Sequence, residues 1–128
     1  MENLAEIFIL VMLAIVFLQS GIDKIVDWSG NIGWLKGHFA NSPLKNMVPF
    51  SLFIITILEI LSGLSAVVGI VSLLTCGGTL FALISAILSA ITFSLLFLGQ
   101  RLAKEYPGAQ GIVVYMIPTF ILLYLLTN

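Results

Sequence analysis

One carboxylate stands in the middle of a long apolar segment, and it is the residue of this sequence best placed for chemistry. The run from Val48 to Ile70 is almost wholly apolar, and Glu59 is its central residue. A run of this length crosses the roughly 30 Å hydrocarbon core of a bilayer. Because an ionisable side chain at that depth costs about 2.5–3.5 kcal/mol on insertion scales, Glu59 needs a reason to be there.

Two interpretations of Glu59 stay open. In the functional one, it handles a proton or binds a ligand. In the structural one, it bonds to Gln19, a serine or a backbone carbonyl and holds the helices together. The charged form of a buried carboxylate loses its hydration, so we expect Glu59 to be protonated unless Lys24 or Arg101 reaches it. Both cations are expected about three helical turns nearer the surface than Glu59, at 3.6 residues per turn.

Further polar residues gather where the first and third apolar runs end. Gln19 and Asp23 are i,i+4 neighbours on one helix face, and so are Ser20 and Lys24. Arg101 ends the third run on the same side. The sequence therefore predicts a polar pocket closed by Glu59. For the outer charges, Asp23, Lys24 and Arg101, an ion network at the membrane surface is the favoured interpretation and a role in the pocket is the alternative. The pocket candidates are Glu59, Gln19, Asp23, Lys24 and Arg101.

The composition indicates that these residues lie in a membrane protein. Of the 128 residues, 60% are hydrophobic and 9% are charged, and the mean hydropathy is +1.19. A soluble domain carries roughly 25% charged residues. The net charge of −1 leaves no footprint for nucleic acid. We predict an all-α integral membrane protein, a single four-helix transmembrane bundle over residues 1–128, with spans at about 4–26, 48–70, 79–100 and 111–127.

The loops predict an orientation and a set of interface anchors. All Lys and Arg residues fall at the first and third loops, which the positive-inside rule places in the cytoplasm, with both termini outside. They are Lys24, Lys36, Lys45, Arg101 and Lys104. The first loop can form a short interfacial helix over Ile32–Ala40. Aromatic residues expected at the headgroup level are Trp28, Trp34, Tyr106 and Tyr115.

Several kinds of chemistry find no support in the sequence. His38 is the only histidine and Cys76 the only cysteine, so neither a zinc-ligand pattern nor a disulfide or Cys-x-x-Cys pair exists. We expect His38 to be an ordinary loop residue. We assign no catalytic residue, no metal and no evident cofactor.

Small residues form stripes on the second and third spans. Ser62, Gly63 and Ala66 share a face with Glu59, and small residues let helices approach closely in lipid. The third span carries two further stripes, Ala82-Ala86-Ala90 and Ser85-Ser89. We expect part of these faces to stay free for a homo-oligomer or a protein partner.

With these residues placed, the chain resembles a DoxX-type protein. The family pattern has four spans, a Gly-x-x-Lys ending to the first, here Gly21 to Lys24, and a Glu before small residues in the second, here Glu59 with Gly63. The stretch from Gly99 to Ala109, leading to Tyr115, is similar to that of small DoxX-like bacterial members. Many members carry an early arginine in span one, which is missing between Glu6 and Leu13.

The resemblance implies a multi-pass protein of the bacterial inner membrane that works beside a redox complex near quinone. It favours a non-catalytic subunit that anchors or seats a partner, with quinone implied by the family alone. The alternative is a small carrier or binding protein that uses the Glu59 pocket for a proton or small solute. A catalytic redox subunit is the weakest hypothesis.

Overall fold

The structure, a computed structural model, is all α-helical over the residues that it describes and confirms the predicted fold class. It describes residues 3–43, 46–75, 78–104 and 106–127, so Lys45 and Cys76 lie outside the described residues. The helices are α1 (Leu4–Val26), α2 (Trp28–His38), α3 (Val48–Thr75), α4 (Leu80–Leu102) and α5 (Tyr106–Thr127). All except α2 are long and apolar enough to cross a membrane.

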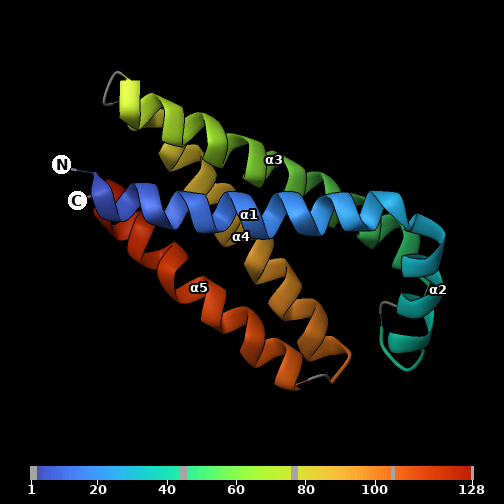
Figure 1. Cartoon of the computed structure of the whole chain (residues 1–128). Coiled ribbons are helices and arrows are strands. Elements are labelled where there is room, and N and C mark those ends of the chain that lie inside the picture. Colours follow the sequence, from blue (N-terminus) through green and yellow to red (C-terminus); the bar gives the residue numbers. More distant parts are fainter. Residues whose placement is uncertain (1–2, 44–45, 76–77, 105, 128) are drawn as a thin grey trace.

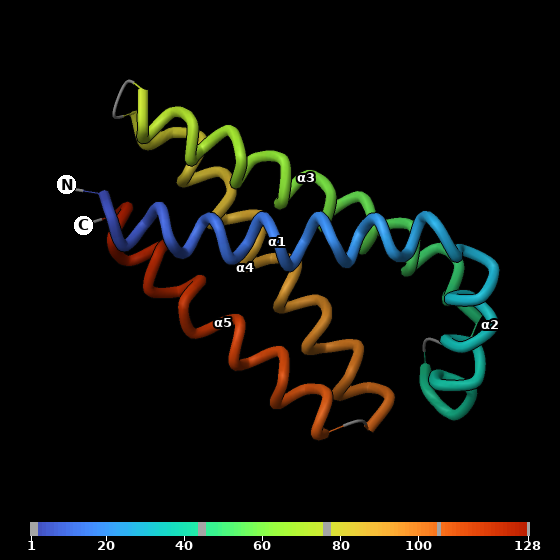
Figure 2. The backbone as a smooth tube through the Cα atoms, viewed as in Figure 1, coloured from blue at the N-terminus to red at the C-terminus, as the bar shows by residue number. Residues whose placement is uncertain are grey.

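The four long helices form a bundle in which each helix packs mainly against the long helix that precedes or follows it in the chain. α3 packs against α1 on one side and α4 on the other, and α4 also packs against α5. The start of α1 and the end of α5 lie at one end of the bundle, together with the end of α3 and the start of α4 (Figures 1 and 2). The short helix α2, the end of α4 and the start of α5 lie toward the opposite end. This arrangement brings the ends of α1 and α4 and the start of α3 to the same end as α2.

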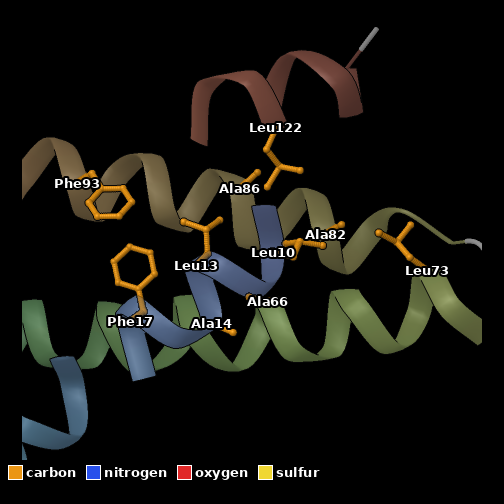
Figure 3. Close-up of a cluster of buried hydrophobic side chains, with 10 residues drawn as sticks. All are labelled: Leu10, Leu13, Ala14, Phe17, Ala66, Leu73, Ala82, Ala86, Phe93 and Leu122. Atoms are coloured by element: carbon orange, nitrogen blue, oxygen red, sulfur yellow. The ribbon is translucent and has the colours of Figure 1, made fainter. Parts of the chain in front are cut away.

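The core lies along α1, which passes in front of both α3 and α4 (Figures 1 and 3). Phe17 of α1 packs on Phe93 of α4, with ring centroids 4.6 Å apart. Leu10 and Leu13 are fully buried on the same face of α1, and Leu122 of α5 closes the cluster. Large apolar side chains cover the outer faces of the long helices, where they contact lipid.

The small-residue stripes of α3 and α4 face each other. A Cβ added at Gly69 would lie 3.0 Å from the backbone Cα of Ala82, so the two helices touch closely there. The Ser85 hydroxyl donates to the Ser62 carbonyl oxygen at 3.2 Å. Ala82 and Ala86 are fully buried. Ala82 and Ala86 therefore do not belong to the part of these faces that was expected to stay free, because the bundle itself uses them.

Some helices are longer than the sequence indicates. α5 begins at Tyr106 rather than near Gly111, because a proline in the first helical turn, here Pro107, loses no intrahelical hydrogen bond. α3 continues to Thr75, since residues 71–75 contain neither glycine nor proline. The helix expected over residues 32–40 occupies Trp28–His38 instead.

Candidate functional site

The buried face of α1 leads directly to a lysine. Leu10, Leu13, Phe17 and Gly21 are buried at spacings of three and four, and Lys24 continues this stripe by three residues. A Cβ added at Gly21 would press on the Ile60 side chain of α3, so the glycine lets the two helices approach closely. The stripe therefore aims Lys24 at α3.

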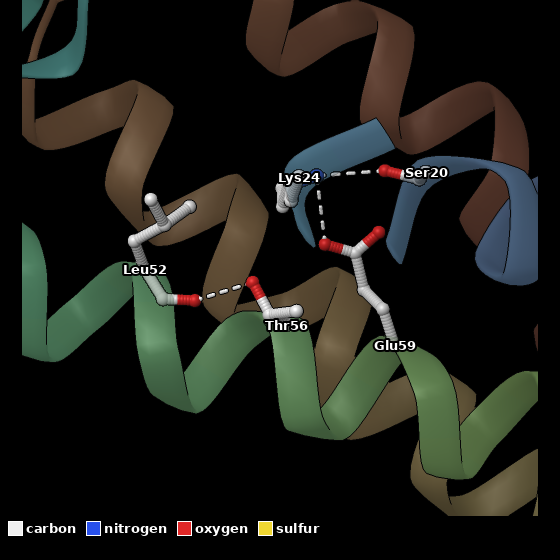
Figure 4. Close-up of polar contacts among 5 residues, drawn as sticks. All are labelled: Ser20, Lys24, Leu52, Thr56 and Glu59. Atoms are coloured by element: carbon white, nitrogen blue, oxygen red, sulfur yellow. Dashed lines mark hydrogen bonds and ion pairs between the residues drawn. The ribbon is translucent and has the colours of Figure 1, made fainter. Parts of the chain in front are cut away.

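Lys24 meets Glu59 inside the bundle (Figure 4). Its Nζ lies 2.9 Å from Glu59 Oε1 and donates a hydrogen bond to Ser20 Oγ at 2.7 Å. Glu59 is 1% exposed, whereas the Lys24 side chain is 21% exposed. Among the described residues, no donor meets the hydrogen-bond geometry for Glu59 Oε1. The contact with Lys24 is therefore close enough for an ion pair but does not have the angles of a hydrogen bond. The pair leaves no net charge at this point of the bundle.

This contact corrects the expected placement of the cations. Lys24 was expected about three turns from Glu59, at 3.6 residues per turn, which would favour a protonated carboxylate. The structure places the last turn of α1 beside the middle of α3, within reach of the lysine side chain. Lys24 therefore reaches Glu59, whereas Arg101 does not. The nearby Thr56 hydroxyl takes no part, since it donates to the Leu52 carbonyl oxygen of its own helix at 2.7 Å (Figure 4).

The other three pocket candidates do not share in this contact. Gln19 and Asp23 are exposed on a neighbouring face of α1. Arg101 is also exposed, and its guanidinium lies over the Tyr106 ring, 4.6 Å from the centroid. Ser20, which is not among the predicted pocket residues, joins the site by accepting a hydrogen bond from Lys24. Its i,i+4 spacing to Lys24 was the signal that could have identified it.

A cavity of about 330 Å³ opens between α2, the first part of α3 and the last part of α4. Most of its lining is apolar, including Leu35 of α2, Leu52 of α3 and Leu96 of α4. Lys24 contributes to the same lining and so connects the cavity to buried Glu59. Among the described residues, the other polar side chains of the lining are those of His38, Ser51 and Gln100. Sequence reasoning missed this cavity, because it exists only where α2 folds back against the bundle.

A hydrogen bond fixes α2 across the cavity. His38 Nε2 lies 3.1 Å from Gln100 Oε1 of α4, and since Oε1 can only accept, the ring nitrogen donates. Trp34 stacks on the His38 ring, with centroids 4.8 Å apart. The expectation that His38 is an ordinary loop residue is therefore wrong: it joins α2 to α4.

The four predicted aromatic anchors occupy different surroundings. Trp34 is 64% exposed although it also borders the cavity, and Trp28 is half-buried at the start of α2. Tyr106 lies under the Arg101 guanidinium. Tyr115 lies about midway along α5, because that helix begins early, and its ring stacks 5.8 Å from that of Phe93. Tyr115 therefore lies away from the ends of α5, where a residue at the headgroup level is expected.

Among the described residues, no three His, Cys, Asp or Glu side chains gather closely enough to hold a metal ion. Comparisons of the chain with family models, with curated proteins and with solved structures found no match. The chemistry of the site must therefore be inferred from its own geometry. It offers a lysine donor, already paired with a carboxylate, at the wall of an apolar cavity.

Proposed function

We propose that the protein is a DoxX-like integral membrane subunit without catalytic chemistry of its own, which anchors a partner within a larger, quinone-linked redox complex. The observation that supports this role is the cavity between α2, α3 and α4, with Lys24 in its wall. Its apolar lining suits a lipophilic molecule, and the lysine supplies a donor for a carbonyl oxygen such as that of a quinone.

The ion pair supports a binding role because burying two charges costs free energy of folding. Removing two charges from water is costly, and apolar replacements of buried ion pairs are often as stable or more stable. Lys24 and Glu59 are thus poor choices if packing were their only purpose. A fixed, neutralised donor beside an apolar cavity is a preorganised binding group.

We infer the location and orientation from the charges. The described cations at the end of the bundle that carries α2 are Lys24, Lys36, Arg101 and Lys104. With the positive-inside rule, this end faces the cytoplasm of a bacterial inner membrane and both termini lie outside. The cavity then opens on the cytoplasmic side, where a partner could reach its ligand.

Purification from native membranes in mild detergent tests the proposal. Mass spectrometry should find a co-purifying oxidoreductase, and solvent extraction should find quinone. Ser51→Phe fills the cavity and should release the quinone, whereas Ser94→Phe adds the same ring at an exposed position of α4 and should retain it. Purified protein that carries neither an oxidoreductase nor quinone would contradict the proposal.

A second candidate function is a small carrier or binding protein for a proton or small solute. It is favoured by the continuity from the cavity through Lys24 to Glu59, which is 1% exposed. Proton-coupled uptake into vesicles, abolished by Glu59→Gln, would support the carrier. Uptake that survives this substitution would exclude a role of Glu59 in it.

A further inference from the structure

We propose that the cavity selects a neutral lipophile whose polar end is a carbonyl group, and that it discriminates against lipophiles with an anionic head. This deepens the proposed function, since it rests on the same cavity and names the chemical class that the cavity accepts. The selection follows from the charge balance of the Lys24–Glu59 pair and not from the shape of the cavity alone.

The Lys24 ammonium group has at least one N–H donor left for a further acceptor. An ammonium group has three N–H donors and no acceptor. Ser20 Oγ accepts one hydrogen, and Glu59 Oε1 lies on another side at ion-pair distance. At least one donor is left, on a side chain that lines the cavity and keeps 21% exposure. A carbonyl oxygen at the inner end of a ligand would accept it.

The charge balance decides which acceptor fits. Glu59 already neutralises Lys24, so a neutral carbonyl adds a hydrogen bond and leaves the site uncharged. A carboxylate in the same place would leave one unbalanced negative charge beside Glu59, in surroundings of low dielectric that strengthen the repulsion. The other titratable group of the described lining is His38, and its Nε2 already donates to Gln100. The described lining therefore offers an anion no free cation.

The same balance predicts how the selectivity can be inverted. Glu59→Gln keeps the size of the side chain but removes the charge that neutralises Lys24. The lysine then presents an uncompensated positive charge to the cavity, so an anionic head becomes the better ligand. Lys24→Met removes the donor and should weaken the binding of the carbonyl ligand.

Photolabelling in nanodiscs of zwitterionic lipid tests the selectivity. The probes are a long-chain methyl ketone and a fatty acid of equal chain length, each with a diazirine, at a pH that ionises the acid. In the wild-type protein the ketone should label cavity residues about tenfold more than the acid, the ratio that corresponds to ~1.4 kcal/mol. Glu59→Gln should reverse the preference, and Lys24→Met should reduce ketone labelling. Lys36→Met, at an exposed position of α2, is the matched control and should change neither.

The comparison of ketone and acid labelling in the wild-type protein tests the selectivity without any variant. The test therefore still holds if one of the variants misfolds. If the acid labels the cavity as well as the ketone, the selectivity is wrong while the cavity and its role as a ligand site stand. If neither probe labels the cavity but an oxidoreductase co-purifies, the inference fails and the subunit role stands. If the ketone labels the cavity and no oxidoreductase co-purifies, the inference stands and the subunit role fails.

Discussion

Lys24 and Glu59 come from different spans, yet the lysine ammonium lies 2.9 Å from the glutamate carboxylate, and each neutralises the other inside the bundle. A glycine one turn earlier in α1, Gly21, lies against the Ile60 side chain, next to Glu59. The close contact between α1 and α3 and the Lys24–Glu59 ion pair thus lie next to each other in the bundle. The pair is both a packing feature and the polar element of the cavity wall.

Breaking this pair on one side should destabilise the protein strongly. Removal of one partner of a buried ion pair costs about 3–5 kcal/mol, and the lower part of this range is expected here because Lys24 is partly exposed. Glu59→Leu and Lys24→Met should each lower the unfolding temperature in detergent. The double variant should recover most of the loss, because no charge is then left unpaired.

Glu59→Gln gives a second result to compare. The sequence alone predicts little change, since glutamine keeps the shape of glutamate and can donate a hydrogen bond. With Lys24 in contact, the same substitution leaves an unpaired cation, so we expect a measurable loss of stability. Two results together would show that the ion pair contributes nothing to stability. One is a Glu59→Gln protein as stable as wild type, and the other is a Glu59→Leu/Lys24→Met double variant whose loss of stability equals the sum of the two single losses.

The close contact of α3 with α4 predicts an effect at Gly69. A Cβ there would lie 3.0 Å from the Ala82 Cα and nitrogen, which are backbone atoms and cannot move alone. Gly69→Ala should therefore destabilise the bundle by about 1–3 kcal/mol, as overpacking does. Gly111→Ala is the control, because nothing lies within 4 Å of its added Cβ. Equal unfolding free energies for the two variants would contradict the close contact.

Two neighbouring serines of α4 should respond differently to the same substitution. Ser85 Oγ donates to the Ser62 carbonyl oxygen, whereas buried Ser89 Oγ has no hydrogen-bond partner among the described residues. Ser85→Ala should cost about 0.6 kcal/mol, the average for such bonds in membranes. Ser89→Ala should be neutral or stabilising, because it removes a hydroxyl that is buried without a partner. Thermal unfolding of both variants checks the order.

The charge distribution predicts the orientation in the membrane. A reporter that is active only outside the cytoplasm should be active when fused to either terminus, since both termini lie at the end of the bundle opposite α2. A fusion in the α4–α5 connection should be inactive. A cytoplasmic C-terminus would reverse the orientation and place the cavity on the outer side.

The sequence by itself determined the parts of this protein that depend on local composition. The four spans and the mid-span position of Glu59 follow from hydropathy along the chain, which needs no knowledge of neighbouring helices. The first residues of α5 were missed, because Pro107 indicates a loop as readily as a first helical turn.

Only the tertiary structure decided which polar side chains meet. Gln19 and Asp23 share one face of α1, and Ser20 and Lys24 share the next, about 100° away. The rotation of α1 about its own axis selects between the two pairs, and the packing of Phe17 on Phe93 fixes that rotation. The cavity likewise depends on α2 packing beside α3 and on the hydrogen bond from His38 to Gln100 of α4, two residues far apart in the chain that no local pattern connects.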